Sequence, residues 1–326
     1  MDLRLTFNEV PEEYDNLRPR YADALFMDVI QFSALDSTKK ALEIGIGTGQ
    51  ATLPFLTIGC ELTAIEIGDK LARYSREKFK AYKRFKVVNQ DFESVALEEN
   101  SYDLIYSASA FHWIAPEVGM SKVYRLLKTG GVFAWFSVQP APTQEYIHDE
   151  LEKVYEEYGR YFNGGKMQFD QMPEVRKHQS YRVNAFKQYG FIEIQNKLYS
   201  GSRTLNARDY ALLCSTYSDH RAIPEKERIP FLQKIEDVIN NNGGEFIFKD
   251  TFLLCMGRKC EKIEAPQVCA DRRKLPPAGR TIPQQLARCG ISVRHIMVMK
   301  MALLSHSCHT GGVRGSRRAA TLRRFF

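Results

Sequence analysis

Three glycines with alternating spacing stand where a ligand-binding turn is expected. Gly45, Gly47 and Gly49 lie at the end of the apolar run 41–46. Glycine lets the backbone turn sharply and lets a ligand approach without a Cβ in the way, although such a turn can also be purely structural. A dinucleotide-binding turn would carry its third glycine at position 50. That position is Gln50, so the following helix end is less suited to a pyrophosphate.

Two carboxylates follow the next two apolar runs. Glu66 lies roughly 20 residues past the first glycine, where an acid can accept hydrogen bonds from both ribose hydroxyls. Asp91 follows the run 85–89 with Phe92 beside it, which favours a carboxylate near an adenine amino group and a ring against its face. Either acid could instead face solvent at a strand end. Because the carboxyl ends of parallel strands meet at one edge of a sheet, the combination indicates a nucleoside-binding edge.

Alternating apolar runs and amphipathic stretches predict the elements that position these residues, in a doubly wound α/β fold. Strands are expected over 41–46, 62–67, 85–89, 102–107, 132–138, 191–199 and 245–256. Helices are expected from the glycine turn to 58, over 69–82, from 116 to the glycine pair at 130–131, and over 144–160, 206–217 and 225–240. Asp69 is expected to cap the second of these helices, and Pro54 to kink the first or mark its first turn.

Composition narrows the class of protein. A hydrophobic share of 44% and a charged share of 26% are ordinary for a globular chain. No apolar run reaches the roughly 20 residues that span a bilayer, and the first residues do not form a signal peptide, so a cytoplasmic location is expected. The seven cysteines show no CxxC pair and no zinc-ligand spacing. No metal site is therefore expected.

Charge separates the last part of the chain from the rest. Residues 1–260 hold 33 Lys and Arg against 36 Asp and Glu, whereas residues 261–326 hold 13 against 3. The slightly acidic body indicates no surface for nucleic acid. The basic end lacks a sustained helix or strand period, which predicts a non-native or disordered tail. The alternative is a basic arm for nucleic acid or anionic lipid, but Phe325 and Phe326 are its only aromatic residues.

The chain resembles the class I S-adenosylmethionine-dependent methyltransferases of the methyltransferase type 11 group, and within that group the trans-aconitate methyltransferase-like branch. The likeness spans about residues 7–258 and is weaker from 141 onward. The matching motifs are Glu43-x-Gly45-x-Gly47-x-Gly49, Glu66, Gln90-Asp91-Phe92, Tyr102-Asp103-Leu104, Phe111-His112-Trp113, Leu126-Leu127-Lys128-Thr129-Gly130-Gly131 and Tyr14-x3-Arg18-Pro19-x-Tyr21.

This resemblance implies the arrangement of the whole chain. It implies a Rossmann-like, seven-stranded methyltransferase sheet whose final hairpin, 191–199 with 245–256, is reversed, together with a helical cap. The implied domains are a cofactor-covering segment (1–35), an S-adenosylmethionine-binding domain (36–140), and a substrate cap with the last two strands (141–258), followed by the tail (261–326).

The resemblance also implies which residues contact the cofactor, S-adenosyl-L-methionine. Glu66 would bind the ribose, and Asp91 and Phe92 the adenine. Ser107 and Ala108 would face the sulfonium, while the glycines would line the methionine portion. The full implied set is Tyr14, Arg18, Glu43, Gly45, Ile46, Gly47, Thr48, Gly49, Glu66, Ile67, Asp91, Phe92, Ser107 and Ala108.

The sequence says less about the methyl acceptor. A general base is needed only if the acceptor must lose a proton, and His112 is the first candidate because it follows the fourth expected strand. The alternative is that His112 only packs against the cofactor. Arg160, Arg203 and Arg221 lie among tyrosines in the cap and could bind a small acidic or aromatic acceptor, or form a solvated helix face. The partner expected is a small molecule, and the oligomeric state stays open.

Two other functions compete with a methyltransferase. One is a nicotinamide-dependent oxidoreductase on a related sheet, against which Gln50 counts. The other is a non-catalytic module that binds S-adenosylmethionine without turnover, which intact glycine and acid positions do not exclude.

Overall fold

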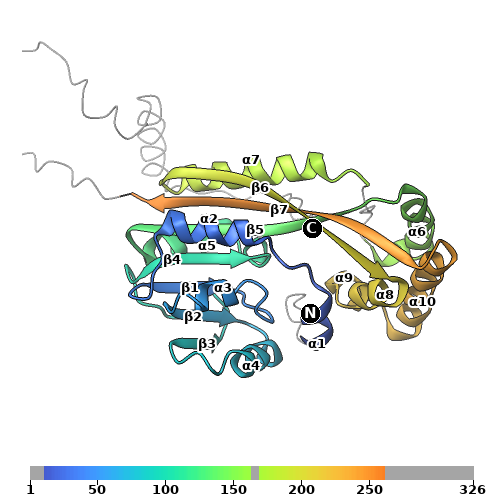
Figure 1. Ribbon diagram of the computed structural model, residues 1–326, viewed down its shortest axis with the longest axis horizontal. Coiled ribbons are helices and arrows are strands. Elements are labelled where there is room, and N and C mark those ends of the chain that lie inside the picture. The colour runs from blue at the N-terminus through green and yellow to red at the C-terminus, as the bar shows by residue number, and fades with distance from the viewer. Residues whose placement is uncertain (1–10, 163–168, 261–326) are drawn as a thin grey trace, which may run out of the picture. The chain divides into compact units, whose positions relative to one another are not determined.

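A seven-stranded sheet runs through the part of the chain that the computed structural model describes, residues 11–162 and 169–260. Its strands are β1 (Lys40–Ile44), β2 (Glu61–Glu66), β3 (Phe85–Asn89), β4 (Tyr102–Ala108), β5 (Leu127–Pro142), β6 (Phe191–Asn206) and β7 (Glu245–Lys259). They lie in the order β3-β2-β1-β4-β5-β7-β6 (Figure 1). Neighbouring strands among β1 to β5 pair in parallel, and β7 runs antiparallel between β5 and β6. The predicted α/β sheet with a reversed final hairpin is confirmed.

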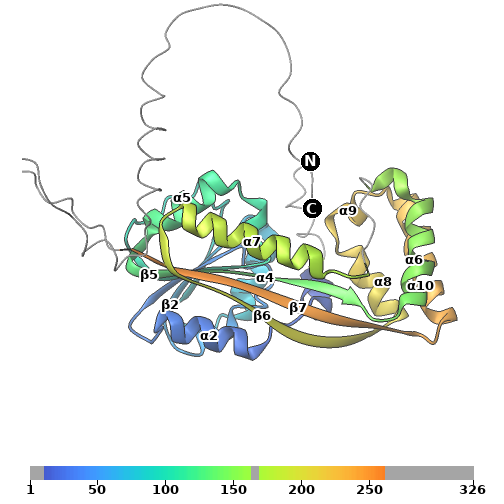
Figure 2. The same ribbon diagram turned by 90° about the horizontal axis from the view of Figure 1, so that it is seen from above.

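Helices cover both faces of this sheet and gather beyond one end of it. They are α1 (Pro11–Leu17), α2 (Asp23–Ser33), α3 (Leu53–Leu56), α4 (Asp69–Lys78), α5 (Pro116–Leu126), α6 (Glu145–Glu157), α7 (Met172–Gln188), α8 (Ala207–Ser215), α9 (Ser218–Arg221) and α10 (Glu225–Asn241). Figure 2 shows α2 on one face and α5 and α7 on the other. The helices α6, α8 and α10 surround the far ends of the last three strands, and we call α6 and α8 to α10 the helical lobe.

Burial along the strands follows from these layers. Every residue of β1 after Lys40 is buried, as expected for a central parallel strand covered on both faces. Along most of the edge strand β6, half-buried and exposed residues alternate. Three apolar clusters fill the interior: one under α2 and α3 around Phe55, one under α5 and α7 around Phe133, and one in the helical lobe around Phe231.

Helix α7 was absent from the sequence-based expectation, and its composition explains why. The buried positions of its 17 residues are Val175, Arg182, Ala185 and Phe186. A charged residue on the buried face interrupts the apolar period by which amphipathic helices are recognised.

Several element boundaries also differ from expectation. Helix α5 ends at Leu126 and β5 begins at the next residue, so the glycine pair lies inside the strand, next to a register shift in its pairing with β4. Glycine commonly marks such a bulge. The prediction that Asp69 caps the helix was wrong, because the N-cap residue of α4 is Gly68 and Asp69 is the first residue of the helix. This helix ends at Lys78 and not at the expected residue 82. Pro54 does lie in the first turn of the short helix α3.

The remaining expectations concern the tail, membranes and metals. The tail (261–326) lies outside the described residues. Across the described helices, none combines the length and apolarity that crossing a membrane requires. Within residues 11–162 and 169–260 there is no group of three or more His, Cys, Asp and Glu side chains that could hold a metal ion.

Candidate active site

The glycine turn after β1 is fixed by the packing of the protein around it. The backbone amides of Gly45 and Ile46 both donate to the carbonyl of Ile65, at 2.9 and 3.2 Å. Gly45 has a φ of 72°, which side chains rarely tolerate, and a Cβ there would lie 2.4 Å from the Cβ of Ala110. The turn therefore lies directly against the segment that follows β4. Glycine at position 45 serves this contact, whatever ligand lies nearby.

Glu66, the last residue of β2, binds the glycine turn through its side chain. Its Oε2 accepts a hydrogen bond from the amide of Gly47 at 2.8 Å, and its Oε1 from the amide of Gly68 at 2.9 Å. The residue is 5% exposed, and burial raises its pKa although the amide donors oppose that rise. Each carboxylate oxygen can accept a second bond. Glu66 can therefore hold the turn and still accept hydrogen bonds from a ligand.

Glu43 lies below the turn, inside the sheet. It is 1% exposed, and its Oε2 accepts hydrogen bonds from the hydroxyls of Thr52 (2.8 Å) and Tyr106 (2.9 Å). Burial raises the pKa of Glu43 to about 8 against these two donors, and the nearby charge of Glu66 adds to the rise. Glu43 is thus largely uncharged at neutral pH and supports the loop from within the core.

The two residues expected around the adenine lie in different environments. Asp91 is half-buried at the edge of the sheet, where its Oδ1 and Oδ2 accept from the amide and hydroxyl of Ser94 at 2.7 and 2.6 Å. Phe92 is 3% exposed within the apolar cluster under α5, and the ammonium of Lys122 lies 5.1 Å from its ring centroid. The carboxylate is thus at the predicted edge, whereas the ring packs in the core.

The other predicted contact residues lie close to these. Ser107 is fully buried and donates to the carbonyl of Ile44 at 2.8 Å, and Ala108 is half-buried next to it. Ile46 and Thr48 are buried in the turn, while Ile67 is half-buried after β2. The structure therefore brings the end of β4 to the same edge as the glycine turn.

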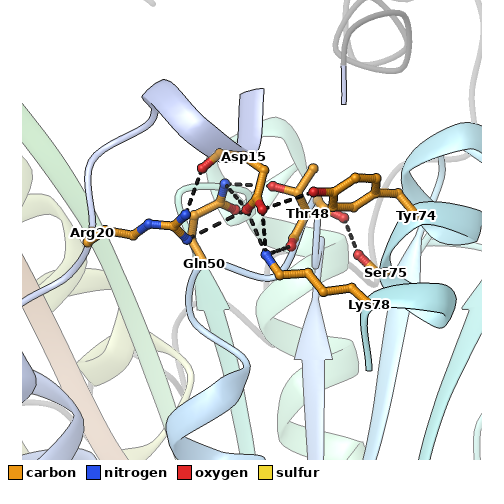
Figure 3. A network of polar contacts seen from close by, with 8 residues as sticks. Asp15, Arg20, Thr48, Gln50, Tyr74, Ser75 and Lys78 are labelled. Atoms are coloured by element: carbon orange, nitrogen blue, oxygen red, sulfur yellow. Dashed lines mark hydrogen bonds and ion pairs between the residues drawn. The ribbon is translucent and has the colours of Figure 1, made fainter. Parts of the chain in front are cut away.

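An acid that sequence reasoning missed joins α1 to the glycine turn (Figure 3). The carboxylate of Asp15, which is 7% exposed, accepts from the ammonium of Lys78 at 2.7 and 2.8 Å and from the hydroxyl of Tyr74 at 3.0 Å. Burial disfavours the charge of Asp15, yet these partners hold its pKa below the usual range. Lys78 also donates to the carbonyl of Thr48 at 2.9 Å. We call Asp15, Lys78, Tyr74 and Thr48 the α1–turn network.

The residues expected to cover the cofactor lie on either side of Asp15, and the structure describes the side chains of only some of them. Tyr14 belongs to α1, and its side chain lies outside the part that the structure describes. Arg18 donates to the carbonyl of Thr216 at 3.2 Å and lies over the ring of Tyr217, 4.6 Å from its centroid. The hydroxyls of Tyr21 and Ser109 are 2.7 Å apart. The N-terminal segment thus contacts both the sheet edge and the helical lobe.

His112 follows β4 on a short 3-10 turn, Phe111–Trp113. Its side chain is exposed, but the protein surrounds it closely enough to lower its pKa to about 4, and the positive charges of Arg182 and His178 add to this shift. His112 is therefore neutral at pH 7 and a weak base. A Brønsted base this weak suits an acceptor that needs little help to lose a proton.

The cap arginines predicted to bind a carboxylate have partners within the protein. Arg203 pairs with Asp250 at 2.8 Å, and Arg160 with Glu227 at 2.9 Å. Arg221 donates to the carbonyl of Ser215 at 3.4 Å. The buried arginine of this region is instead Arg182, on the helix that the sequence analysis missed.

Comparisons with known proteins find similarity to methyltransferases. Residues 42–135 match the family model described as "Methyltransferase domain". An uncharacterized methyltransferase-like protein of Schizosaccharomyces pombe is 25% identical over 73% of this chain and 87% of its own length. A probable S-adenosylmethionine-dependent methyltransferase of Saccharomyces cerevisiae is 30% identical over 45% of this chain and 50% of its own length.

A curated relative and a solved structure add to this comparison. A malonyl-[acyl-carrier protein] O-methyltransferase of Paenibacillus is 30% identical over 37% of this chain and 46% of its own length. A solved structure of a candidate type II methyltransferase from Anaeromyxobacter dehalogenans aligns with a TM-score of 0.51 and 18% identity, covering 74% of this chain and 98% of that one. The latter likeness supports the fold. Assignment to the trans-aconitate methyltransferase-like branch stays a prediction.

Proposed function

We propose that this chain, whose residues 42–135 match the family model of a methyltransferase domain, is a class I S-adenosylmethionine-dependent enzyme that transfers a methyl group to a small carboxylic acid. The observation that carries the cofactor part of this proposal is the buried carboxylate of Glu66, bonded to the glycine turn at the edge where β1, β2 and β4 end. The matched domain covers this edge, and nothing in it favours a nicotinamide-dependent oxidoreductase.

The residues at this edge fit S-adenosylmethionine. Glu66 keeps acceptor capacity for a ribose diol, and Asp91 lies where an adenine amino group could donate to it. Gly45, Gly47 and Gly49 would line the methionine portion, with Ser107 and Ala108 toward the sulfonium. When bound, S-adenosylmethionine supplies a methyl group on a sulfonium, a strong electrophile. The remaining task of the protein is to hold the acceptor in line and to exclude water.

The state of His112 supports a carboxylate as the methyl acceptor. With a pKa of about 4, this imidazole is a poor base for a hydroxyl or an ammonium group. A carboxylate already carries the lone pair that attacks a methyl group and has no proton to lose at pH 7. His112 would then position the acceptor without removing a proton. The Paenibacillus relative is likewise named as an O-methyltransferase of a malonyl group, which carries a carboxylate.

Calorimetric titration with S-adenosylhomocysteine tests the cofactor part of this proposal. Replacing Glu66→Gln should weaken binding by about 1–3 kcal/mol, because an amide cannot accept from the turn and from a diol as a carboxylate does. Glu61→Gln is the matched control, since Glu61 is half-buried at the other end of the same strand. Wild-type protein that binds NAD but not S-adenosylhomocysteine would overturn the proposal. Equal affinities in wild type and Glu66→Gln would remove Glu66 from the site.

A further inference from the structure

A buried positive charge without a carboxylate partner lies beneath α7. Arg182 is 4% exposed. Its Nη1 donates to the carbonyls of Trp135 and Leu253 at 3.4 and 3.3 Å, and its Nη2 to the hydroxyl of Ser137 at 2.5 Å. Within residues 11–162 and 169–260, no carboxylate forms an ion pair with this guanidinium. Burial lowers the pKa of Arg182 to about 10, so it is charged at pH 7.

Two buried N–H groups, one on Arg182 itself and one on the adjacent Trp135, have no hydrogen-bond acceptor among the described residues. The Nε of Arg182 and the Nε1 of Trp135 are buried without a hydrogen-bond partner in the described structure. Trp135 is 4% exposed, and its ring lies 4.7 Å from the guanidinium carbon. Buried donors are normally satisfied, and a buried charge is costly unless it is paired. Two unsatisfied donors beside an unpaired cation are the features expected of a site for an anionic oxygen group.

This pair lies at the end of the sheet where the methyl group is expected. Trp135 on β5 is directly opposite Ser107 on β4, the residue predicted to face the sulfonium. The charge of Arg182 reaches His112, whose pKa it helps to lower. Tyr181 precedes Arg182 on α7, is 47% exposed, and packs its ring 6.1 Å from that of Trp135. Tyr181 thus contacts Trp135 and also reaches the surface.

We propose that Arg182 and Trp135 bind a carboxylate of the methyl acceptor, with their free Nε–H and Nε1–H groups as the donors. This inference rests on the proposed function and adds the residues that select the acceptor. Arginine suits the task because its planar fork matches a carboxylate and keeps its charge when buried. Movement of Tyr181 would admit the acceptor, since both binding side chains are covered.

The competing explanation is that Arg182 only joins β5 to β7 through the carbonyls of Trp135 and Leu253. Acetate, the smallest probe with a methyl-bearing carboxylate, separates the two. The chain has only two tryptophans, so its nitrogen-15 spectrum contains two indole N–H signals, and Trp135→Phe assigns the one from Trp135. Protein saturated with S-adenosylhomocysteine is titrated with acetate at pH 7, and with acetamide as the neutral match at equal ionic strength.

We expect acetate to shift the Trp135 indole signal saturably and acetamide to leave it in place. Arg182→Met should abolish the acetate shift while S-adenosylhomocysteine still binds. Arg176→Met, an exposed arginine on the same helix, should keep the shift. An unmoved Trp135 signal in wild type, or an equal shift in Arg182→Met, would overturn the proposal. Failure of wild type to bind S-adenosylhomocysteine would instead contradict the proposed function, so the two failures are distinguishable.

Stability gives a second, independent reading if the variant spectra are poor. A purely structural Arg182 contributes stability, so Arg182→Met should then lower the melting temperature by several degrees. Because Arg182 also donates to groups on β5 and β7, the informative quantity is the rise in melting temperature caused by acetate in protein saturated with S-adenosylhomocysteine. For a ligand site, acetate should raise the melting temperature of wild type and of Arg176→Met but not that of Arg182→Met. An equal rise in wild type and Arg182→Met, or no rise in wild type, would count against the site.

Discussion

The two halves of the proposed active site differ in how completely their buried polar groups are paired. Around the glycine turn, Glu66, Glu43 and Asp15 each accept at least two hydrogen bonds from groups of the protein. Beneath α7, Arg182 and Trp135 each keep a buried donor without a partner. The cofactor side is thus held in shape by the protein itself, whereas the acceptor side is left to be completed by a ligand.

This difference fits the two ligands that the proposal assigns. A loop whose geometry is already fixed loses little conformational entropy when its ligand binds, which favours tight binding. An unpaired charge favours an acceptor that carries the opposite charge and disfavours neutral analogues, which would leave it buried and unpaired. The fixed glycine turn therefore favours tight binding of the cofactor. The unpaired charge of Arg182 favours selection of an anionic acceptor.

The largest expected effect comes from breaking the packing of the glycine turn. Gly45→Ala should abolish S-adenosylhomocysteine binding and destabilise the fold by about 2–4 kcal/mol, because a strained φ and an overpacked contact act together. Gly130→Ala is the matched control: Gly130 has a similar φ of 76° but nothing within 4 Å of an added Cβ. Chemical denaturation and calorimetry measure both variants. Equal losses in the two would show that backbone strain alone explains the position.

The α1–turn network should have the next largest effect. Asp15→Asn removes a partly buried ion pair with Lys78 and should weaken S-adenosylhomocysteine binding about tenfold or more, because α1 loses its hold on the turn. Glu77→Gln, which breaks an exposed pair with Lys80 on the same helix α4, should change affinity little. Dissociation rates from stopped-flow measurements provide the comparison. A faster rate in Glu77→Gln than in Asp15→Asn would contradict a role for α1 in retaining the ligand.

The pH dependence of stability should reveal Glu43. Its pKa in the folded protein is raised to about 8, whereas in the unfolded chain it is near 4.5. Between these values the folded state binds the extra proton at Glu43, so the contribution of Glu43 to the free energy of unfolding falls as pH rises, by up to about 1.4 kcal/mol per pH unit. Glu43→Gln should lose this contribution and Glu61→Gln should keep it, measured by urea unfolding from pH 5 to 8. The difference between wild type and Glu43→Gln isolates it, because His112, with its pKa lowered to about 4, adds a slope of opposite sign at the acidic end of the range. Equal slopes in wild type and Glu43→Gln would show that Glu43 is ionised in the fold.

The features that could be predicted from the sequence depend on residues that are close together in the chain. The features that could not be predicted depend on residues that are far apart in the chain. The turn Gly45–Gly49 and the strand Phe85–Asn89 were recognised because their signals lie within a few residues. Asp15 and Lys78 are 63 residues apart and share no pattern. Arg182 was missed for another reason: a lone charge on a buried helix face resembles a break in the helix. Arg182 becomes a candidate site residue only in the three-dimensional structure, which shows that its Nε is buried without a hydrogen-bond partner among the described residues.

The smallest expected effect belongs to Arg160, which the sequence placed among the carboxylate-binding candidates. In the structure its side chain is 63% exposed and pairs with Glu227 at 2.9 Å. Exposed pairs contribute about 0–1 kcal/mol, because solvent screens them and ordering two long side chains costs entropy. Arg160→Met should therefore change neither the melting temperature nor the acetate-induced shift of the Trp135 signal. If Arg160→Met removed that shift while Arg182→Met kept it, the anion would bind in the helical lobe. The contrast between the fully paired polar groups at the glycine turn and the unpaired donors beneath α7 would then not distinguish the cofactor side from the acceptor side.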